Sequence, residues 1–193
     1  MVEPRQTPPR MSADAFMAWY DQQPEGERYE LHDGVVYPNQ MQGERLAHAE
    51  TKLRIAESFR AQIRAGKLPC SGFGDGMAVR VDQDIIYEPD AMVRRGPLLP
   101  GDTTIILDPM IVVEVVSPSS HRIDVLTKLT HYFRNPNIVH YLIVIPSTRQ
   151  AIHHRRGVGE RIETTIHPAG VIEFSPPGLS LDLADIFAGD VLE

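Results

Sequence analysis

One carboxylate stands within one of the two longest apolar runs of the chain. Glu114 interrupts the stretch Ile-Val-Val-Glu-Val-Val at positions 111–116. Burying an unpaired charge costs several kcal/mol or forces the group to take up a proton. The sequence therefore predicts that Glu114 lines a cleft or pairs with a cation. A core ion pair with an arginine is the alternative to a functional role.

A second acid, Asp90, follows Pro89 in the run 85–93, which predicts a neighbouring strand. Proline removes a donor from the hydrogen-bond ladder, so an edge or a bulge is expected here. Bulges often turn side chains toward active sites. By alternation Asp90 would share a face with Glu88. An exposed aspartate at the entry of a strand fits the sequence equally well.

Lys128 lies on the predicted helix that follows the Glu114 strand. A polar stripe at spacings of three and four is formed by His121, Asp124, Lys128 and His131. The opposite face carries Ile123, Leu126, Leu129 and Phe133. Taken alone, this stripe predicts a solvated face with an Asp124–Lys128 pair worth a few tenths of a kcal/mol. Because Glu114 needs a partner and the helix returns over the sheet from the same strand end, Lys128 is also a candidate for that partner.

Asp90, Glu114 and Lys128 together suit metal-assisted hydrolysis of a phosphodiester. Two carboxylates can hold a magnesium ion, which polarises a phosphoryl oxygen and lowers the pKa of a bound water. A lysine can orient that water or stabilise the charge of the transition state. The chain carries no Walker loop, GxSxG elbow or HExxH motif. His153 and His154 are too closely spaced for one metal and predict an exposed pair on a hairpin.

The elements that would position these residues follow from periodicity and turn signals. Helices are expected over 12–20, 44–65 and 121–134, hairpins over 28–37 and 151–166, and strands over 77–81, 85–93, 111–116, 138–145 and 179–183. The apolar stripe of the long helix consists of Leu46, Ala49, Leu53, Ala56, Phe59 and Ile63. The run 111–116 is expected to be a central strand covered on both faces. This order predicts a mixed α/β or α+β domain.

The composition is that of an ordinary globular protein. The 193 residues suit one domain over 1–193, with residues 1–10 as a flexible tail. The formal net charge of -7 does not favour attraction to nucleic acid, so such a substrate would need a metal or a local basic patch. A basic rim could be formed by Arg94, Arg95, Arg122 and Arg134. A single cysteine, and the lack of a signal peptide or a membrane-length apolar stretch, predict a cytoplasmic protein without a membrane span.

These residues resemble the PD-(D/E)XK nuclease superfamily, and more narrowly its Uma-two branch of small bacterial proteins related to restriction endonucleases. The resemblance spans almost the whole chain and is carried by Tyr29-Glu30-Leu31, Asp33-Gly34, His48, Pro89-Asp90, Val113-Glu114-Val115, Ser117-Pro118-Ser119, Asp124, Lys128, Tyr132 and Gly178-Leu179. It implies a restriction-endonuclease-like core of helix, three strands, helix and strand. An N-terminal helix and hairpin would precede this core, and extra C-terminal strands would follow it.

The resemblance also implies site residues, namely Asp90, Glu114, Lys128, Glu30 and His48. Asp90 and Glu114 would bind Mg²⁺, with Mn²⁺ as an alternative. The superfamily places a lysine two residues after the second carboxylate, where this chain has Val116. In this branch the lysine role moves to the next helix, which points to Lys128. DNA would be the substrate, and cutting both strands with two copies implies a homodimer.

Three functions are compatible with the sequence. The first is a magnesium-dependent DNA endonuclease, which the resemblance favours. The second is a non-catalytic module that binds nucleic acid or protein, because a fold alone does not establish chemistry. The net charge of -7 gives this module some weight. The third is a nuclease that acts on RNA or on a nucleotide.

Overall fold

A computed structural model describes residues 10–39, 45–116 and 122–188, so the predicted tail 1–10 lies outside the described residues except for Arg10. The helices are α1 (Ala13–Tyr20), α2 (Leu46–Gly66), α3 (Arg122–Tyr132) and α4 (Leu183–Ile186), with a 3-10 turn η1 (Pro146–Thr148). The strands are β1 (Tyr29–His32), β2 (Val35–Pro38), β3 (Cys70–Gly74), β4 (Ala78–Asp82), β5 (Ile85–Tyr87), β6 (Ala91–Arg95), β7 (Ile105–Ile106), β8 (Pro109–Val115), β9 (His140–Ile145), β10 (Gln150–Arg156), β11 (Ile162–His167), β12 (Val171–Phe174) and β13 (Leu179–Asp182).

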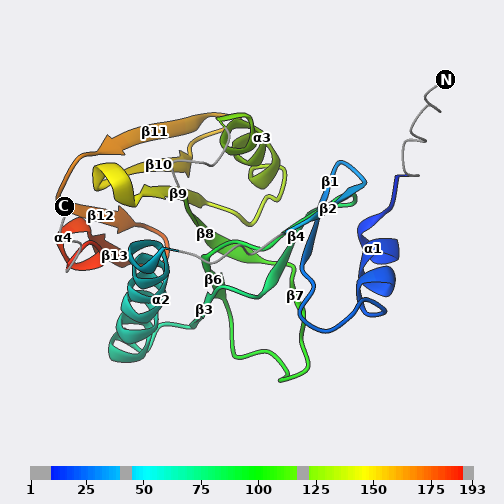
Figure 1. The fold of residues 1–193 in the computed structure, drawn as a ribbon. Coiled ribbons are helices and arrows are strands. Elements are labelled where there is room, and N and C mark those ends of the chain that lie inside the picture. Colours follow the sequence, from blue (N-terminus) through cyan, green and yellow to red (C-terminus); the bar gives the residue numbers. More distant parts are fainter. Residues whose placement is uncertain (1–9, 40–44, 117–121, 189–193) are drawn as a thin grey trace.

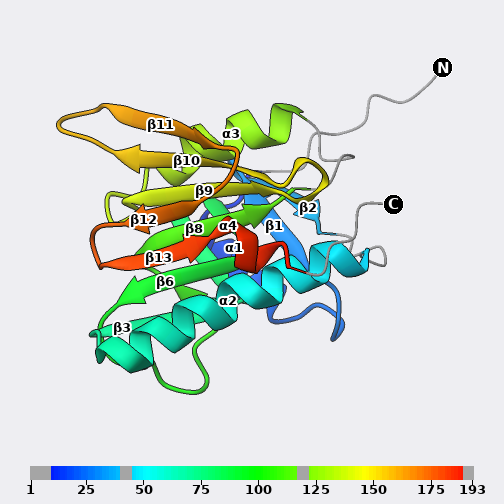
Figure 2. The ribbon, with the colours of Figure 1, turned by 90° about the vertical axis from the view of Figure 1, so that its left-hand side faces the viewer.

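The strands form a small sheet, a large sheet and a separate hairpin (Figures 1 and 2). The small sheet has the order β2-β1-β5-β4-β7, the large sheet has the order β11-β10-β9-β8-β6-β3, and β12 pairs with β13. Within the large sheet, β8 is parallel to β9 and antiparallel to β6. The mixed α/β class predicted from the order of elements is confirmed.

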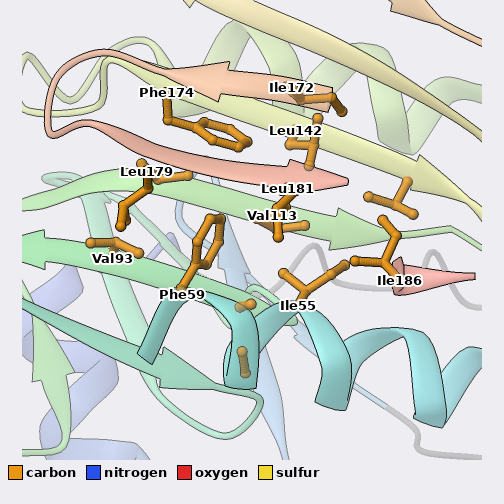
Figure 3. Packing of buried hydrophobic residues seen from close by; sticks show 14 of the residues in the cluster. Ile55, Phe59, Val93, Val113, Leu142, Ile172, Phe174, Leu179, Leu181 and Ile186 are labelled. Atoms are coloured by element: carbon orange, nitrogen blue, oxygen red, sulfur yellow. The ribbon is translucent and has the colours of Figure 1, made fainter. Parts of the chain in front are cut away.

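The core order implied by the resemblance is present around the large sheet. α2 precedes β3, β6 and β8, and α3 then leads into β9, while β4 and β5 are diverted into the small sheet. α2 and the β12–β13 hairpin cover one face, where Ile55 and Phe59 pack in one cluster with Val113 and Leu181 (Figure 3). Tyr132 of α3 packs on the other face. This confirms the core of helix, three strands, helix and strand.

β8 is the buried central strand that the sequence predicts. Val113 and Val115 belong to the apolar cluster under α2, and Val112 belongs to the cluster on the opposite face. Glu114 is the one residue of this strand that is partly exposed. Since side chains alternate along a strand, Glu114 points to the same face as Val112, which is the face that α3 covers.

The predicted strand over 85–93 is wrong as a single element. Its first part is β5 of the small sheet, and its last part is β6 of the large sheet. Glu88, Pro89 and Asp90 lie between the two strands. Pro89 has no N–H for a ladder, which suits a point where the chain leaves one sheet and enters another. The alternation expected to place Glu88 and Asp90 on one face does not extend across this break.

The buried face of α2 differs from the predicted apolar stripe. Leu46 and Leu53 are 76% and 53% exposed. Thr51, Lys52 and Ile55 are buried in their place. The prediction is wrong for the first half of the helix, where a lysine points inward, whereas Ala56, Phe59 and Ile63 of the predicted stripe are buried as expected. Across the described ranges, none of the helices is both long and apolar enough to span a membrane.

The helix α3 turns part of its polar stripe inward, so the predicted solvated face is wrong. Lys128 and His131 are buried, whereas Leu126 is 65% exposed. His131 Nδ1 lies 2.5 Å from the Tyr87 hydroxyl oxygen on the small sheet. Polar side chains of the small sheet thus stabilise the buried polar face of α3. The predicted stripe position His121 and the side chain of Asp124 lie outside the described residues, and so does the predicted Asp124–Lys128 pair.

The prediction of an exposed histidine pair on β10 is also wrong. His153 and His154 are 7% and 6% exposed. His153 Nε2 lies 2.9 Å from His140 Nδ1, and His154 Nδ1 lies 2.8 Å from the Thr164 hydroxyl. Phe174 of the β12–β13 hairpin packs against the His153 ring. Burial lowers the pKa of both His140 and His153 to about 4, so both rings are neutral at physiological pH.

The N-terminal helix and both predicted hairpins are confirmed. The Ser12 side chain caps α1 by accepting the Ala15 N–H at 3.2 Å. Asp33 and Gly34 join β1 to β2 with φ of 47° and 79°, the left-handed pair that a tight hairpin turn needs. β10 and β11 form the second hairpin. The sequence did not predict β3, β7 or β12.

Candidate active site

Glu114 projects from β8 toward α3, where two side chains bind one of its carboxylate oxygens. Lys128 Nζ lies 3.0 Å from Glu114 Oε1, and the Tyr132 hydroxyl donates to the same oxygen at 2.6 Å. Lys128 and Tyr132 are four residues apart and so share one face of the helix. The Glu114 side chain is only 12% exposed. The cation that Glu114 requires is a lysine, and the alternative of an arginine in the core is wrong.

Asp90 is held against the backbone of β8. The Val115 N–H donates to Asp90 Oδ2 at 2.6 Å, so this carboxylate lies beside the residue that follows Glu114. Lys52 Nζ lies 3.0 Å from Asp90 Oδ1. Because Asp90 belongs to the break between β5 and β6, its side chain can turn to the end of β8. The alternative of an exposed aspartate at a strand entry is wrong, since the side chain is 15% exposed.

Glu30, on β1 of the small sheet, joins the site through Lys128. Glu30 Oε1 lies 3.3 Å from Lys128 Nζ and accepts the Glu88 N–H at 3.1 Å. Its other oxygen, Oε2, lies 3.0 Å from His32 Nε2. The small sheet therefore contributes a buried carboxylate to a site whose other members surround the large sheet.

His48, near the start of α2, borders the site through the backbone. Its Nε2 hydrogen-bonds to the carbonyl oxygen of Val115. Val115 therefore binds Asp90 through its N–H and His48 through its carbonyl. His48 ties the helix α2 to the end of β8, next to the two carboxylates.

A second buried lysine, Lys52 on α2, enters the site without having been predicted. Lys52 Nζ lies 2.9 Å from Asp75 Oδ2 in addition to its contact with Asp90. Asp75 also accepts from Arg28 Nη2 at 2.5 Å, and Arg28 Nε donates to Glu88 Oε2 at 2.7 Å. These contacts extend the site from the large sheet to Arg28, the residue before the first strand of the small sheet.

One sequence signal could have found Lys52. It stands four residues after His48 and three residues before Ile55, which is the spacing of one helix face. His48 was already a site residue by resemblance. A lysine on the face that carries both His48 and a core isoleucine is expected to point toward the site.

Burial dominates the electrostatics of Glu114. Burial raises the pKa of Glu114 to about 7, and the negative charges of Asp90 and Glu30 act in the same direction. Lys128 and the Tyr132 hydroxyl oppose this shift because they stabilise the ionised form. Near neutral pH, Glu114 of the metal-free protein therefore carries a proton part of the time.

Glu30 shifts in the opposite direction although it shares the same lysine. Burial would raise its pKa, but Lys128, His32 and the Glu88 N–H outweigh burial and lower the pKa to about 2. The difference arises because Glu30 has additional donors, whereas Glu114 lies beside the charge of Asp90. Of the two carboxylates that bind Lys128, Glu114 is thus the one whose charge is less compensated.

The ionic contacts form a network in which negative charge is in excess. The carboxylates are Asp90, Glu114, Glu30, Glu88 and Asp75. The cations are Lys128, Lys52 and Arg28. Counted over these eight described side chains, five negative charges face three positive charges when every carboxylate is ionised. The difference of two equals the charge of one divalent cation.

The donor set fits a hard divalent cation such as Mg²⁺. Asp90 and Glu114 offer carboxylate oxygens, and Mg²⁺ is commonly bound by one or two carboxylates while it keeps several waters. In the part of the chain that the structure describes, no group of three or more His, Cys, Asp or Glu side chains is arranged to hold a metal. Asp90 and Glu114 are the two carboxylates that could hold such an ion together with water.

The predicted basic rim is present only in part. Arg94 is 7% exposed and forms a bidentate ion pair with Asp108, so its place in the rim is wrong. Arg95 and Arg134 are both exposed, and Arg134 pairs with Asp33. The side chain of Arg122 lies outside the described residues.

The fold, a mixed sheet flanked by two helices with Asp90 bound at the end of its central strand, is nuclease-like. A solved structure from Anabaena variabilis, described as a "putative nuclease belonging to DUF820", has a TM-score of 0.73 with 16% identity over 92% of this chain and 98% of that one. The chain belongs to the Uma2 family, described as "Putative restriction endonuclease", whose model matches residues 13–186. "Uncharacterized protein slr1290" of Synechocystis sp. is 26% identical over 183 residues, which are 94% of this chain and 93% of the relative. The family resemblance drawn from the residues is thus confirmed.

Proposed function

We propose that the protein is a magnesium-dependent endonuclease that hydrolyses phosphodiester bonds in DNA, with Mn²⁺ as a replacement for Mg²⁺. The observation that carries this proposal is that Asp90 is bound to the Val115 N–H, one residue from Glu114 at the end of β8, while Lys128 binds Glu114. Membership of a nuclease family supports the reaction class. The excess of negative charge among these ionic contacts supports a divalent cation at this place.

Asp90 and Glu114 would hold the ion. When bound, Mg²⁺ supplies the Lewis acidity that polarises a phosphoryl oxygen and lowers the pKa of a bound water. The Val115 N–H orients Asp90, and the Tyr132 hydroxyl orients Glu114. Both carboxylates are therefore ordered before substrate arrives, so the reaction does not have to supply the cost of ordering them.

Lys128 would act on the phosphate that reacts. Its ammonium group lies against Glu114, where it can orient the attacking water or stabilise the negative charge that develops on the phosphoryl oxygens. Glu30 binds the same ammonium group and restricts its position. His48 acts as a positioning residue, because it holds the carbonyl of the residue whose N–H orients Asp90.

The test is cleavage of supercoiled plasmid and of single-stranded DNA with Mg²⁺ or Mn²⁺. Asp90→Asn and Glu114→Gln should each lower the rate by at least about a hundredfold, as loss of a group that stabilises the transition state commonly does. Asp102→Asn and Glu173→Gln change the same side-chain types at exposed positions and serve as matched controls. Equal activity in the wild type and all four variants would identify a contaminating nuclease and refute the proposal. RNA in the same assay decides between the two nucleic acids.

A non-catalytic binding module is the second candidate, and one observation favours it. Lys52 and the Val115 N–H bind the two oxygens of Asp90, so one ligand position of the metal-free site is taken by an ammonium group. Calorimetry separates the two functions. Absence of Mg²⁺ binding at millimolar concentration, with binding of nucleic acid or a protein partner retained, would favour the module.

A further inference from the structure

Lys52 is a buried lysine that forms an ion pair with Asp90, the first carboxylate of the site. It is 8% exposed, and its ammonium group reaches Asp90 Oδ1 at 3.0 Å and Asp75 Oδ2 at 2.9 Å. A buried lysine is costly unless it is paired and hydrogen-bonded. Here the pairing is with two carboxylates at nearly equal distance, and only Asp90 belongs to the proposed ion site.

We propose that Lys52 is a positioning residue that occupies Asp90 in the metal-free protein and transfers to Asp75 when a divalent cation binds. This inference rests on the proposed function, because it requires Asp90 to be an ion ligand. Lys52 and the ion compete for Asp90 Oδ1, whereas the Val115 N–H keeps the other oxygen in both states. The carboxylate therefore stays in place while its partner changes.

Asp75 is suited to receive Lys52. It is already fixed by Arg28 at 2.5 Å, and Arg28 is fixed in turn by Glu88 at 2.7 Å. Lys52 is within hydrogen-bonding distance of Asp75 before any change, so the transfer requires no new contact to form. An ammonium group that keeps one carboxylate partner avoids most of the cost of leaving the other.

The two lysines of the site have different surroundings, which supports different roles. Lys128 binds Glu114 and Glu30, and it also lies over the Tyr87 ring at 5.0 Å from the centroid. Lys52 binds Asp75, whose side chain is 30% exposed and therefore better solvated than the 11% exposed Glu30. The partner to which Lys52 would move is thus the more accessible one.

The test is Mg²⁺ titration by calorimetry without DNA, on the wild type, Lys52→Met and the matched control Lys67→Met. Lys67 is exposed at the end of the same helix. Lys52→Met should bind Mg²⁺ about tenfold more tightly, since a competitor for Asp90 is lost, and Lys67→Met should match the wild type. A lysine with only a structural role would leave the affinity unchanged or weaken it. Lys52→Gln repeats the test if Lys52→Met proves unstable in a thermal melt.

Asp75→Asn tests the transfer step in a double-mutant cycle. In the wild-type background it should weaken Mg²⁺ binding, because Lys52 loses its second carboxylate. In the Lys52→Met background the same change should have a clearly smaller effect. Equal effects in both backgrounds, or a Lys52 variant that binds no more tightly than the wild type, would overturn the inference while the proposed function stands. A wild type that binds no Mg²⁺ at all would overturn both.

Discussion

Replacement of Glu114 by glutamine should change how the stability of the protein depends on pH. Glutamine keeps the shape of the side chain and can still accept from the Tyr132 hydroxyl, but it cannot ionise. In the folded wild type the pKa of Glu114 is raised from 4.5 to about 7. A carboxyl with a raised folded-state pKa binds its proton more strongly in the folded state. Its contribution to stability is therefore fully present below pH 4.5 and is lost as the pH rises through 7.

The size of this effect follows from the shift. A difference of roughly 2.5 units at about 1.36 kcal/mol per unit gives about 3 kcal/mol between pH 4 and pH 8. For a chain of this length, 1 kcal/mol corresponds to a change in Tm of roughly 2–4 °C, so the expected range is roughly 6–12 °C. Glu30 acts in the other direction, since its lowered pKa gives stability that is lost only as the pH falls through about 2. It therefore adds little to the change above pH 4.5.

The assay is chemical denaturation of the wild type and Glu114→Gln at pH 4 and pH 8, with and without Mg²⁺. The free energy of unfolding of the variant, relative to the wild type, should rise by about 3 kcal/mol from pH 4 to pH 8. Mg²⁺ at pH 8 should stabilise only the wild type, since it binds the folded state with an ionised Glu114. Carboxyl groups that do not interact with Glu114 contribute equally to both proteins and cancel in the difference. A pH dependence that is the same in both proteins would refute the reasoning about Glu114.

Three further substitutions test the site and the fold. Tyr132→Phe removes a donor that stabilises ionised Glu114, so the pH at which stability is lost should move upward in the same denaturation series. Lys128→Met should lower the DNA cleavage rate by about 10² or more, with ion binding by calorimetry retained. Ile55→Ala should cost about 2–5 kcal/mol of unfolding free energy because Ile55 is fully buried, whereas Leu53→Ala on the exposed face should cost less than about 0.5 kcal/mol in urea denaturation.

The sequence predicts that Glu114 needs a partner, because this need depends only on the local composition of its strand. A carboxylate among β-branched residues of a central strand needs a partner wherever the strand lies. The nature of that partner was less predictable from the residues, since the stripe of α3 fits a solvated face equally well. Lys128 gains a second carboxylate, Glu30, only because β1 of the small sheet lies beside it. This second ion pair makes the burial of Lys128 favourable.

The sequence does not reveal which sheet a strand joins. The run 85–93 has strand composition throughout, and nothing local separates β5 from β6 except Pro89. The buried face of the first half of α2 was mispredicted for a related reason, although Ala56, Phe59 and Ile63 are buried as predicted. Leu46 and Leu53 have the spacing of a core face, but Lys52 is drawn inward by two carboxylates that lie far away in the sequence. Apolar periodicity cannot register such long-range ion pairs.

The break at Glu88, Pro89 and Asp90 accounts for the position of the whole site. Because Asp90 is outside any ladder, its carboxylate can accept the Val115 N–H at the end of β8. The backbone N–H of Glu88, at the other end of the break, donates to Glu30 of the small sheet. This three-residue connection thus contributes Asp90 itself and binds Glu30 of the small sheet through the Glu88 N–H. As a result, negative charge accumulates at the boundary between the two sheets. The ammonium groups of Lys52 and Lys128 neutralise only part of this charge. That remaining charge is the physical reason to expect a divalent cation there.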